Sequence, residues 1–99
     1  MRSVKFNDLA TEALEYIAFF IVEESHSIDI ALNFVNKLRK RVRNRLETFP
    51  KSGKFVYTIN GIDYLEIIVD RYIFTYKIEY IDNVEIIHVV DVIHEKQDR

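Results

Sequence analysis

The fold is decided by residues 64–78, which read YLEIIVDRYIFTYKI, and by residues 84–94, which read VEIIHVVDVIH. Apolar and polar residues alternate in the first stretch, whereas the second is almost uninterrupted β-branched sequence. Alternation is typical of a strand with one buried face, and a continuous apolar run is typical of a strand buried on both faces. Since Asp70-Arg71 can turn the chain, we expect strands over residues 62–69, 72–80 and 84–93.

Two further turn signals flank these strands. Asn60-Gly61 is typical of a two-residue hairpin, because both positions tolerate positive φ, and it follows an alternating segment at residues 54–59. Asp82-Asn83 supplies the last turn. The sequence therefore predicts a meandering antiparallel sheet. We expect an aromatic wall of the core from Tyr72, Phe74, Tyr76, Ile78 and Tyr80.

Two helical patterns lie upstream of the sheet, after a short strand candidate at residues 3–6. Asn7 can cap a helix over residues 8–24, and Ser27 can cap a second helix that Pro50 ends. The short connection between them predicts an antiparallel helical hairpin. The expected core faces are Leu9, Ala10, Ala13, Leu14, Ile17, Phe20 and Ile21 in the first helix, and Ala31, Phe34, Val35, Leu38, Val42, Leu46 and Phe49 in the second. Arg45 lies on the second face, where we expect it to extend past the core or meet a carboxylate.

These elements predict an α+β fold, with the helical hairpin packed on one face of a small, mainly antiparallel sheet. The chain has 99 residues, enough for a single domain over residues 1–99 with one core. It has no cysteine, which excludes disulfides, thiolate metal sites and a cysteine nucleophile. No signal peptide or membrane span is expected, so we place the protein in the cytoplasm.

No cofactor or metal is expected either, because the chain has no glycine-rich phosphate loop and no His-x-x-x-His. His88 and His94 share a parity on one predicted strand but lie about 20 Å apart along it. A basic cluster runs from Lys37 to Arg45. We interpret it as a solvated helix face that complements the helix dipole, rather than as a nucleic-acid footprint, because the rest of the chain is acidic on balance.

The order of elements and several motifs resemble the RelE/ParE superfamily of toxins from type II toxin–antitoxin, or plasmid stabilisation, modules. The resemblance spans essentially the whole chain. The residues that carry it are Val4-Lys-Phe-Asn-Asp8, Ala10, Leu14-Glu-Tyr-Ile17, Ala31, Phe34, Leu38, Leu46, Pro50, Gly53, Tyr72-x-x-x-Tyr76 and Val92-Ile-His-Glu-Lys-Gln-Asp98.

Two departures from the family pattern concern activity. Family members usually carry an arginine in the strand before Tyr-x-x-x-Tyr and a second one after its first tyrosine, and here Leu65 and Ile73 stand at these places. In the nuclease branch such cations bind messenger RNA and stabilise charge as the 2′-hydroxyl attacks. The resemblance therefore implies a ParE-like toxin that arrests growth by binding DNA gyrase, rather than an enzyme.

Two alternatives remain. The chain can be a ribosome-dependent, metal-independent messenger RNA endonuclease, with His94 as general acid or base and Arg71, Lys77 and Lys54 as phosphate contacts. Glu66 could then be a base, and Tyr72 or Tyr76 could place a hydroxyl. This alternative requires Lys54, Arg71, Lys77 and His94 to converge on one open face. The other alternative is an inactive relative that survives as an antitoxin-binding protein.

The resemblance also implies a cognate antitoxin whose flexible C-terminal region wraps the toxin, with operator DNA bound by the antitoxin. A sheet covered by helices on one face leaves the other face for such a partner. We expect the antitoxin-binding surface to include Leu65, Ile67, Ile73 and Ile93, with Val69 and Val89 beside them.

Overall fold

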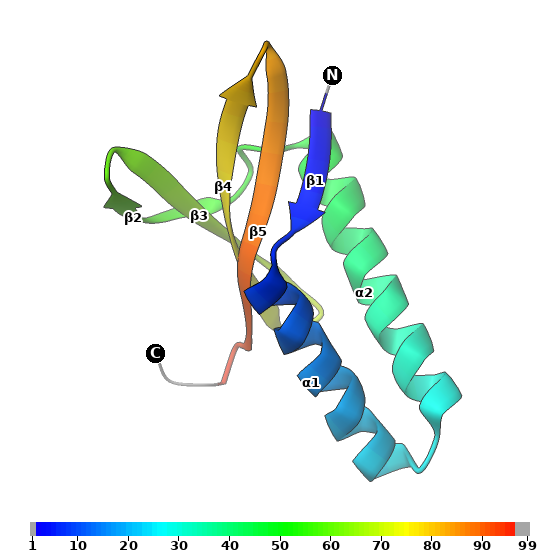
Figure 1. Cartoon of the computed structure of the whole chain (residues 1–99). Coiled ribbons are helices and arrows are strands. Elements are labelled where there is room, and N and C mark those ends of the chain that lie inside the picture. Colours follow the sequence, from blue (N-terminus) through cyan, green and yellow to red (C-terminus); the bar gives the residue numbers. More distant parts are fainter. Residues whose placement is uncertain (1, 97–99) are drawn as a thin grey trace.

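A computed structural model describes residues 2–96 of the chain. Its elements are, in order, β1 (Arg2–Phe6), α1 (Asp8–Ser25), α2 (Ile28–Thr48), β2 (Lys54–Ile59), β3 (Ile62–Val69), β4 (Tyr72–Ile81) and β5 (Val84–His94). The helices form a hairpin that packs beside a single sheet, and the far end of the hairpin projects past the strands (Figure 1). The predicted α+β fold is confirmed.

The helix ends are set by the expected capping residues. The side chain of Asn7 accepts a hydrogen bond of 2.8 Å from the backbone N–H of Ala10, and Ser27 accepts one of 3.2 Å from Ile30. His26 adopts a left-handed conformation with φ 57° and closes α1 by donating its N–H to the carbonyl of Val22. Each side-chain cap contributes about 1 kcal/mol, so the sequence itself defines the hairpin.

The strands follow the spatial order β1-β5-β4-β3-β2, with antiparallel pairing from β2 to β5. Each connecting turn has two residues with positive φ: Asn60-Gly61 at 52° and 78°, Asp70-Arg71 at 50° and 73°, and Asp82-Asn83 at 50° and 65°. Such turns match the right-handed twist of the strands they join. β1 adds to the sheet in parallel beside β5, a placement that the sequence pattern did not predict.

The core lies between the helices and one face of the sheet. Buried side chains of α1 and α2 meet the buried residues of β1, β3, β4 and β5 there. Phe74 and Tyr76 are fully buried, as the aromatic stripe predicted, while Tyr72 and Ile78 are partly buried against the same core. The core consists of Val4, Ala10, Leu14, Val35, Leu38, Val42, Leu46, Ile67, Phe74, Tyr76, Ile87, Val89 and Val92.

Four residues predicted for the core are exposed instead. At about 100° per residue, Leu9 and Phe20 lie about 140° and 120° around the α1 axis from the buried Leu14, so both face outward. Phe49 follows the last turn of α2 with φ −132° and ψ 73°, and it leaves the helical face. Tyr80 lies near the tip of the β4–β5 hairpin, which extends beyond the helices (Figure 1).

Tyr76 joins the sheet to the connection between α2 and β2. Its hydroxyl donates a 2.7 Å hydrogen bond to the carbonyl of Pro50 and accepts one of 3.0 Å from the N–H of Gly53. A Cβ at residue 53 would lie 2.8 Å from the ring of Tyr76 and 2.9 Å from the carbonyl oxygen of Glu66. Glycine is therefore required at residue 53 by close approach.

Candidate functional site

The sheet has a face that neither helix covers, which we call the open face. On β4, Phe74, Tyr76 and Ile78 point toward the helices, so the alternating residues Ile73 and Lys77 point to the open face. Cross-strand pairing then assigns the neighbouring strands to it. The open face carries Tyr64, Glu66 and Ile68 on β3, Ile73, Thr75, Lys77 and Glu79 on β4, and Ile86, His88, Asp91 and Ile93 on β5.

One end of the open face carries a row of three isoleucines. Ile68 pairs with Ile73, and Ile73 pairs with Ile93, so adjacent strands place the three side chains side by side. Ile68 is 52% exposed, and Ile73 and Ile93 are partly exposed. This isoleucine row is an apolar surface suited to a partner chain.

The predicted antitoxin-binding residues divide between the two faces. Ile73 and Ile93 lie in the isoleucine row, whereas Ile67 pairs with Phe74 and is 2% exposed in the core. Leu65 pairs with the buried Tyr76 and packs against the same core. Val69 also packs there, and Val89 is fully buried. Placing Leu65, Ile67, Val69 and Val89 on the open face was wrong.

Ile68 was not among the residues predicted for the open face, although the sequence contains the signal that places it there. A two-residue turn at Asp70-Arg71 pairs Val69 with Tyr72, and paired residues lie on the same face of a sheet. With Tyr72 assigned to the core side, Val69 must follow it there. Alternation along β3 then turns Ile68 to the open face.

The middle of the open face carries a charged cluster formed by Lys77, Glu79 and His88. The ammonium of Lys77 lies 3.1 Å from Oε1 of Glu79, and Nε2 of His88 lies 3.5 Å from the same oxygen. The hydrogen bond from Lys77 holds the pKa of Glu79 below its ordinary value. Nε2 of His88 is buried and has no hydrogen-bond partner among residues 2–96. One carboxylate thus faces two basic side chains.

The residues predicted for RNA cleavage do not meet on the open face. Lys77 lies there, and Lys54 reaches it through its pairing with Glu66 at the sheet edge. Arg71 occupies the β3–β4 turn, where its carbonyl accepts a hydrogen bond from the N–H of Glu95. His94 pairs with Tyr72 on the helix-facing side. The required convergence is absent within the described part of the chain.

A bulge in β5 is responsible for the position of His94. Tyr72 pairs with His94 and Lys77 with His88, so β5 contains one residue more than β4 between these pairs, with the irregularity beside Thr75 and Tyr76. An extra residue reverses the alternation beyond it. His88 and His94, which share a parity in the sequence, therefore lie on opposite faces.

The surroundings of His94 are those of a packing residue. Its ring contacts Tyr72 edge-on with centroids 5.1 Å apart, and Tyr72 contacts Phe34 of α2 in the same way at 6.1 Å. Nδ1 of His94 accepts a hydrogen bond of 3.2 Å from the N–H of Lys96. Burial raises the pKa of both Tyr72 and Tyr76, so their hydroxyls stay protonated at neutral pH. The hydroxyl of Tyr76 is also engaged in the core.

The basic cluster of α2 is mostly engaged in local contacts. The guanidinium groups of Arg39 and Arg43 lie 5.5 and 5.6 Å from the ring centre of Phe6. Arg41 forms an ion pair with Asp70, and Arg45 donates a 3.4 Å hydrogen bond to the carbonyl of Ile68 rather than to a carboxylate. Lys37 and Lys40 are exposed. These contacts support the interpretation of the cluster as a structural, solvated helix face.

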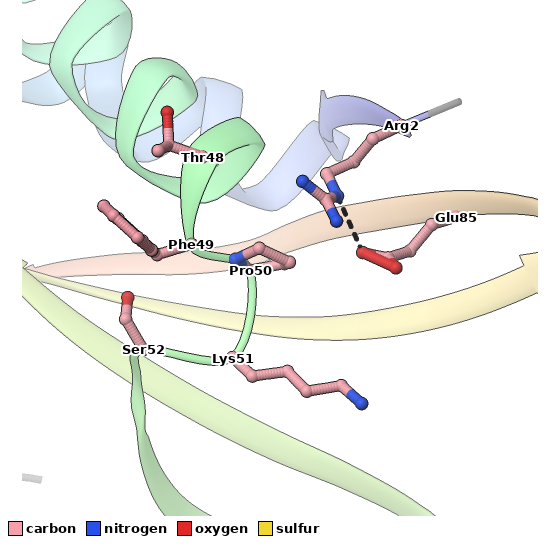
Figure 2. A pocket seen from close by; sticks show the side chains of 7 residues that line it. All are labelled: Arg2, Thr48, Phe49, Pro50, Lys51, Ser52 and Glu85. Carbon is pink, nitrogen blue, oxygen red and sulfur yellow. Dashed lines mark hydrogen bonds and ion pairs between the residues drawn. The ribbon is translucent and has the colours of Figure 1, made fainter.

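A hollow where α2 ends beside β1 and β5 is held by an ion pair. Figure 2 shows Arg2 directed at Glu85, with Nε 2.9 Å from Oε1, beside Pro50 and Lys51. Arg2 also donates to the carbonyl of Glu47, and this ties β1 to the last turn of α2.

Residues 2–96 contain no group of acidic or histidine side chains arranged to hold a metal ion. None of the helices described is long and apolar enough to cross a membrane.

Comparison with known proteins identifies the family. A family model described as "ParE toxin of type II toxin-antitoxin system, parDE" matches residues 4–99. None of the curated proteins compared with the chain matches it. Gln97 and Asp98, the end of the last resemblance motif, lie outside the residues that the structure describes.

Proposed function

Because the chain belongs to the ParE toxin family of type II toxin–antitoxin systems, we propose that it arrests bacterial growth in the cytoplasm by binding DNA gyrase, with no catalytic step of its own. Family membership makes it the toxin component of such a module and implies an antitoxin partner.

The separation of the candidate catalytic residues supports gyrase binding over RNA cleavage. Transesterification of RNA needs preorganised cations around one phosphate, together with a group that transfers a proton. In this chain His94 and Lys77 lie on opposite faces of the sheet, and Arg71 is in a turn. Ile73 belongs to the isoleucine row, and Leu65 packs against the core, so neither replaces a missing cation.

The isoleucine row is our proposed antitoxin-binding site. Apolar side chains on a sheet face that no helix covers suit a segment that folds on binding, because burial of these side chains offsets the entropy lost by the segment. Ile68, Ile73 and Ile93 lie side by side across three strands. In this proposal the antitoxin covers the row, and operator DNA is bound by the antitoxin.

The charged cluster on the open face favours a second candidate function. Lys77 and His88 place two basic side chains beside Glu79, with Lys54 nearer the sheet edge, so an RNA phosphate could bind there without His94. In this candidate the toxin is a messenger RNA endonuclease whose proton transfer relies on His88 or Glu79. The purified chain would then cleave ribosome-bound RNA.

A pair of assays with one double variant tests the proposal. We expect the purified chain to inhibit DNA supercoiling by gyrase and to leave messenger RNA on ribosomes intact. Lys54→Gln combined with Lys77→Gln should preserve growth arrest if gyrase is the target and abolish it if RNA is cleaved on the open face. Pulse labelling after induction should show DNA synthesis falling before protein synthesis.

The opposite order of events in the labelling experiment, with RNA cleavage in the purified system, would replace gyrase inhibition by the nuclease function. Folded protein that affects neither process would identify an inactive relative retained for antitoxin binding. Circular dichroism of the unmodified chain and of the double variant verifies that both are folded.

A further inference from the structure

The outer surface of α1 carries an acidic and aromatic stripe that neither the core nor the open face uses. Glu12, Glu15, Tyr16, Phe19 and Glu23 fall within an arc of about 100° around the helix axis, which we call the α1 stripe. Tyr16 is 78% exposed and Phe19 is 63% exposed. A surface hollow is lined by the first four of these residues.

The charges of α1 are of one sign. Asp8, Glu12, Glu15, Glu23 and Glu24 are its ionisable acids, and residues 8–25 include no lysine or arginine. The ion pairs found among residues 2–96 join other side chains, and the arginines of α2 contact Phe6, Asp70 and the Ile68 carbonyl. Within residues 2–96, the carboxylates of the α1 stripe thus form no ion pair.

The last turn of α1 is electrostatically unfavourable as it stands. A helix C-terminus carries partial negative charge, which basic residues normally complement and acidic residues oppose. Here the last turn has no basic residue and contains Glu23 and Glu24. Local conflicts of this kind are expected at functional sites. A cation supplied by a partner would offset the unfavourable charge.

Charge discriminates among the molecules that could cover this surface. Nucleic acids and anionic lipid surfaces are repelled by a stripe with three carboxylates. A second copy that packed α1 on α1 would bring the same carboxylates together, and the α2 arginines are engaged locally. Phe19 and Tyr16 also require apolar or cationic groups against their rings.

We propose that the α1 stripe binds a basic amphipathic helix of a partner protein. Lysine or arginine side chains of that helix pair with Glu12, Glu15 and Glu23, while its apolar side chains pack on Tyr16 and Phe19, in the manner of helix-in-groove recognition. The stripe and the isoleucine row share no residue, although Phe20, one helical turn from Tyr16, lines a hollow together with Ile93 of the row. The proposal does not depend on whether gyrase is the target.

Fluorescence anisotropy with a synthetic helix tests this proposal on the full chain. The probe is a labelled amphipathic peptide of about 18 residues built from leucine, alanine and lysine, long enough for partial helicity in isolation. Its twin carries glutamate in place of lysine. We expect the lysine peptide to bind, the glutamate peptide to fail, and binding to weaken as salt is raised.

Paired variants distinguish binding at the α1 stripe from nonspecific electrostatic attraction of the peptide. Phe19→Ser and the double variant Glu12→Gln with Glu15→Gln should each weaken binding by about tenfold. The controls are Phe55→Ser and Glu95→Gln, which change an exposed aromatic and an exposed acid elsewhere, and both should bind as the unmodified chain does. Circular dichroism verifies that each variant folds.

The proposal would be overturned if the lysine peptide did not bind the unmodified chain. It would also be overturned if the control variants lost as much affinity as the stripe variants. A dimer that is seen by light scattering and dissociated by Phe19→Ser would instead make a second copy the occupant of the stripe.

Discussion

The two faces of the sheet differ in what their side chains do. Toward the helices, Phe74, Tyr76, Ile87 and Val89 have no exposed surface, and the hydroxyl of Tyr76 both donates and accepts a hydrogen bond. On the open face, Ile68 is half exposed and the charged cluster meets solvent. The helix-facing side therefore supplies the stability of the fold. Substitutions on the open face should therefore cost little in folding, because no helix packs against its side chains.

The largest difference between the faces is expected from adjacent residues of β4. Phe74→Ala should destabilise the fold by about 3–5 kcal/mol, because it empties a fully buried aromatic site. Ile73→Ala, one residue away on the open face, should cost less than half as much, since its side chain is only partly buried. Urea unfolding of both variants measures this difference, and equal losses would contradict the assignment of the two faces.

A smaller effect is expected when only a polar contact is removed from the helix-facing side. Tyr76→Phe deletes the hydroxyl that joins Pro50 and Gly53 and leaves both backbone groups without that partner. We expect a loss of about 1–3 kcal/mol in thermal or urea unfolding. Tyr80→Phe is the matched control, because Tyr80 is 61% exposed and should change stability by less than about 0.5 kcal/mol.

On the open face, a substitution should affect binding more than folding. Ile68→Glu places a charge in the isoleucine row, and we expect about tenfold weaker antitoxin binding by calorimetry. Its unfolding midpoint should remain close to that of the unmodified chain, because the side chain is already 52% exposed. Ile59→Glu is the control, since Ile59 is 50% exposed on β2. Equal binding by both variants would exclude the row as the antitoxin site.

The smallest expected effect concerns pH. The pKa of Glu79 is lowered, chiefly by the hydrogen bond from Lys77. A carboxyl whose pKa is lower in the folded state contributes stability above its unfolded pKa of about 4.3, and this contribution is lost as the pH falls through the lower folded value. Acidification from neutral pH to below about pH 4.3 should therefore destabilise Glu79→Gln slightly less than it destabilises the unmodified chain.

Nuclear magnetic resonance titration of the Glu79 carboxyl provides the direct measurement. A midpoint at or above the ordinary glutamate value would contradict the ion pair with Lys77. Glu95→Gln serves as the control for acid unfolding, because Glu95 is exposed at the end of β5.

Of the four residues predicted to bind the antitoxin, Ile73 and Ile93 lie on the open face, and the misplacements have different causes. Ile73 follows from alternation along β4, whereas Ile93, which has the parity of the buried Val89, reaches the open face because of the β5 bulge. Leu65 and Ile67 were misplaced although the turn at Asp70-Arg71 already contains their register. His94 could not be placed from the sequence in the same way, because the β5 bulge that reverses its face depends on pairing with β4.

Local structure and family membership could both be predicted from residues close together in the sequence. Caps at Asn7 and Ser27, the stop at Pro50 and three two-residue turns act over a few residues, so their energies are independent of the rest of the fold. Three features could not be predicted in this way: β1 pairs with β5 in parallel, Leu9 and Phe20 stay exposed, and His88 and His94 lie on opposite faces of the sheet. Those outcomes depend on which surfaces pack together, and packing is a property of residues far apart in the chain.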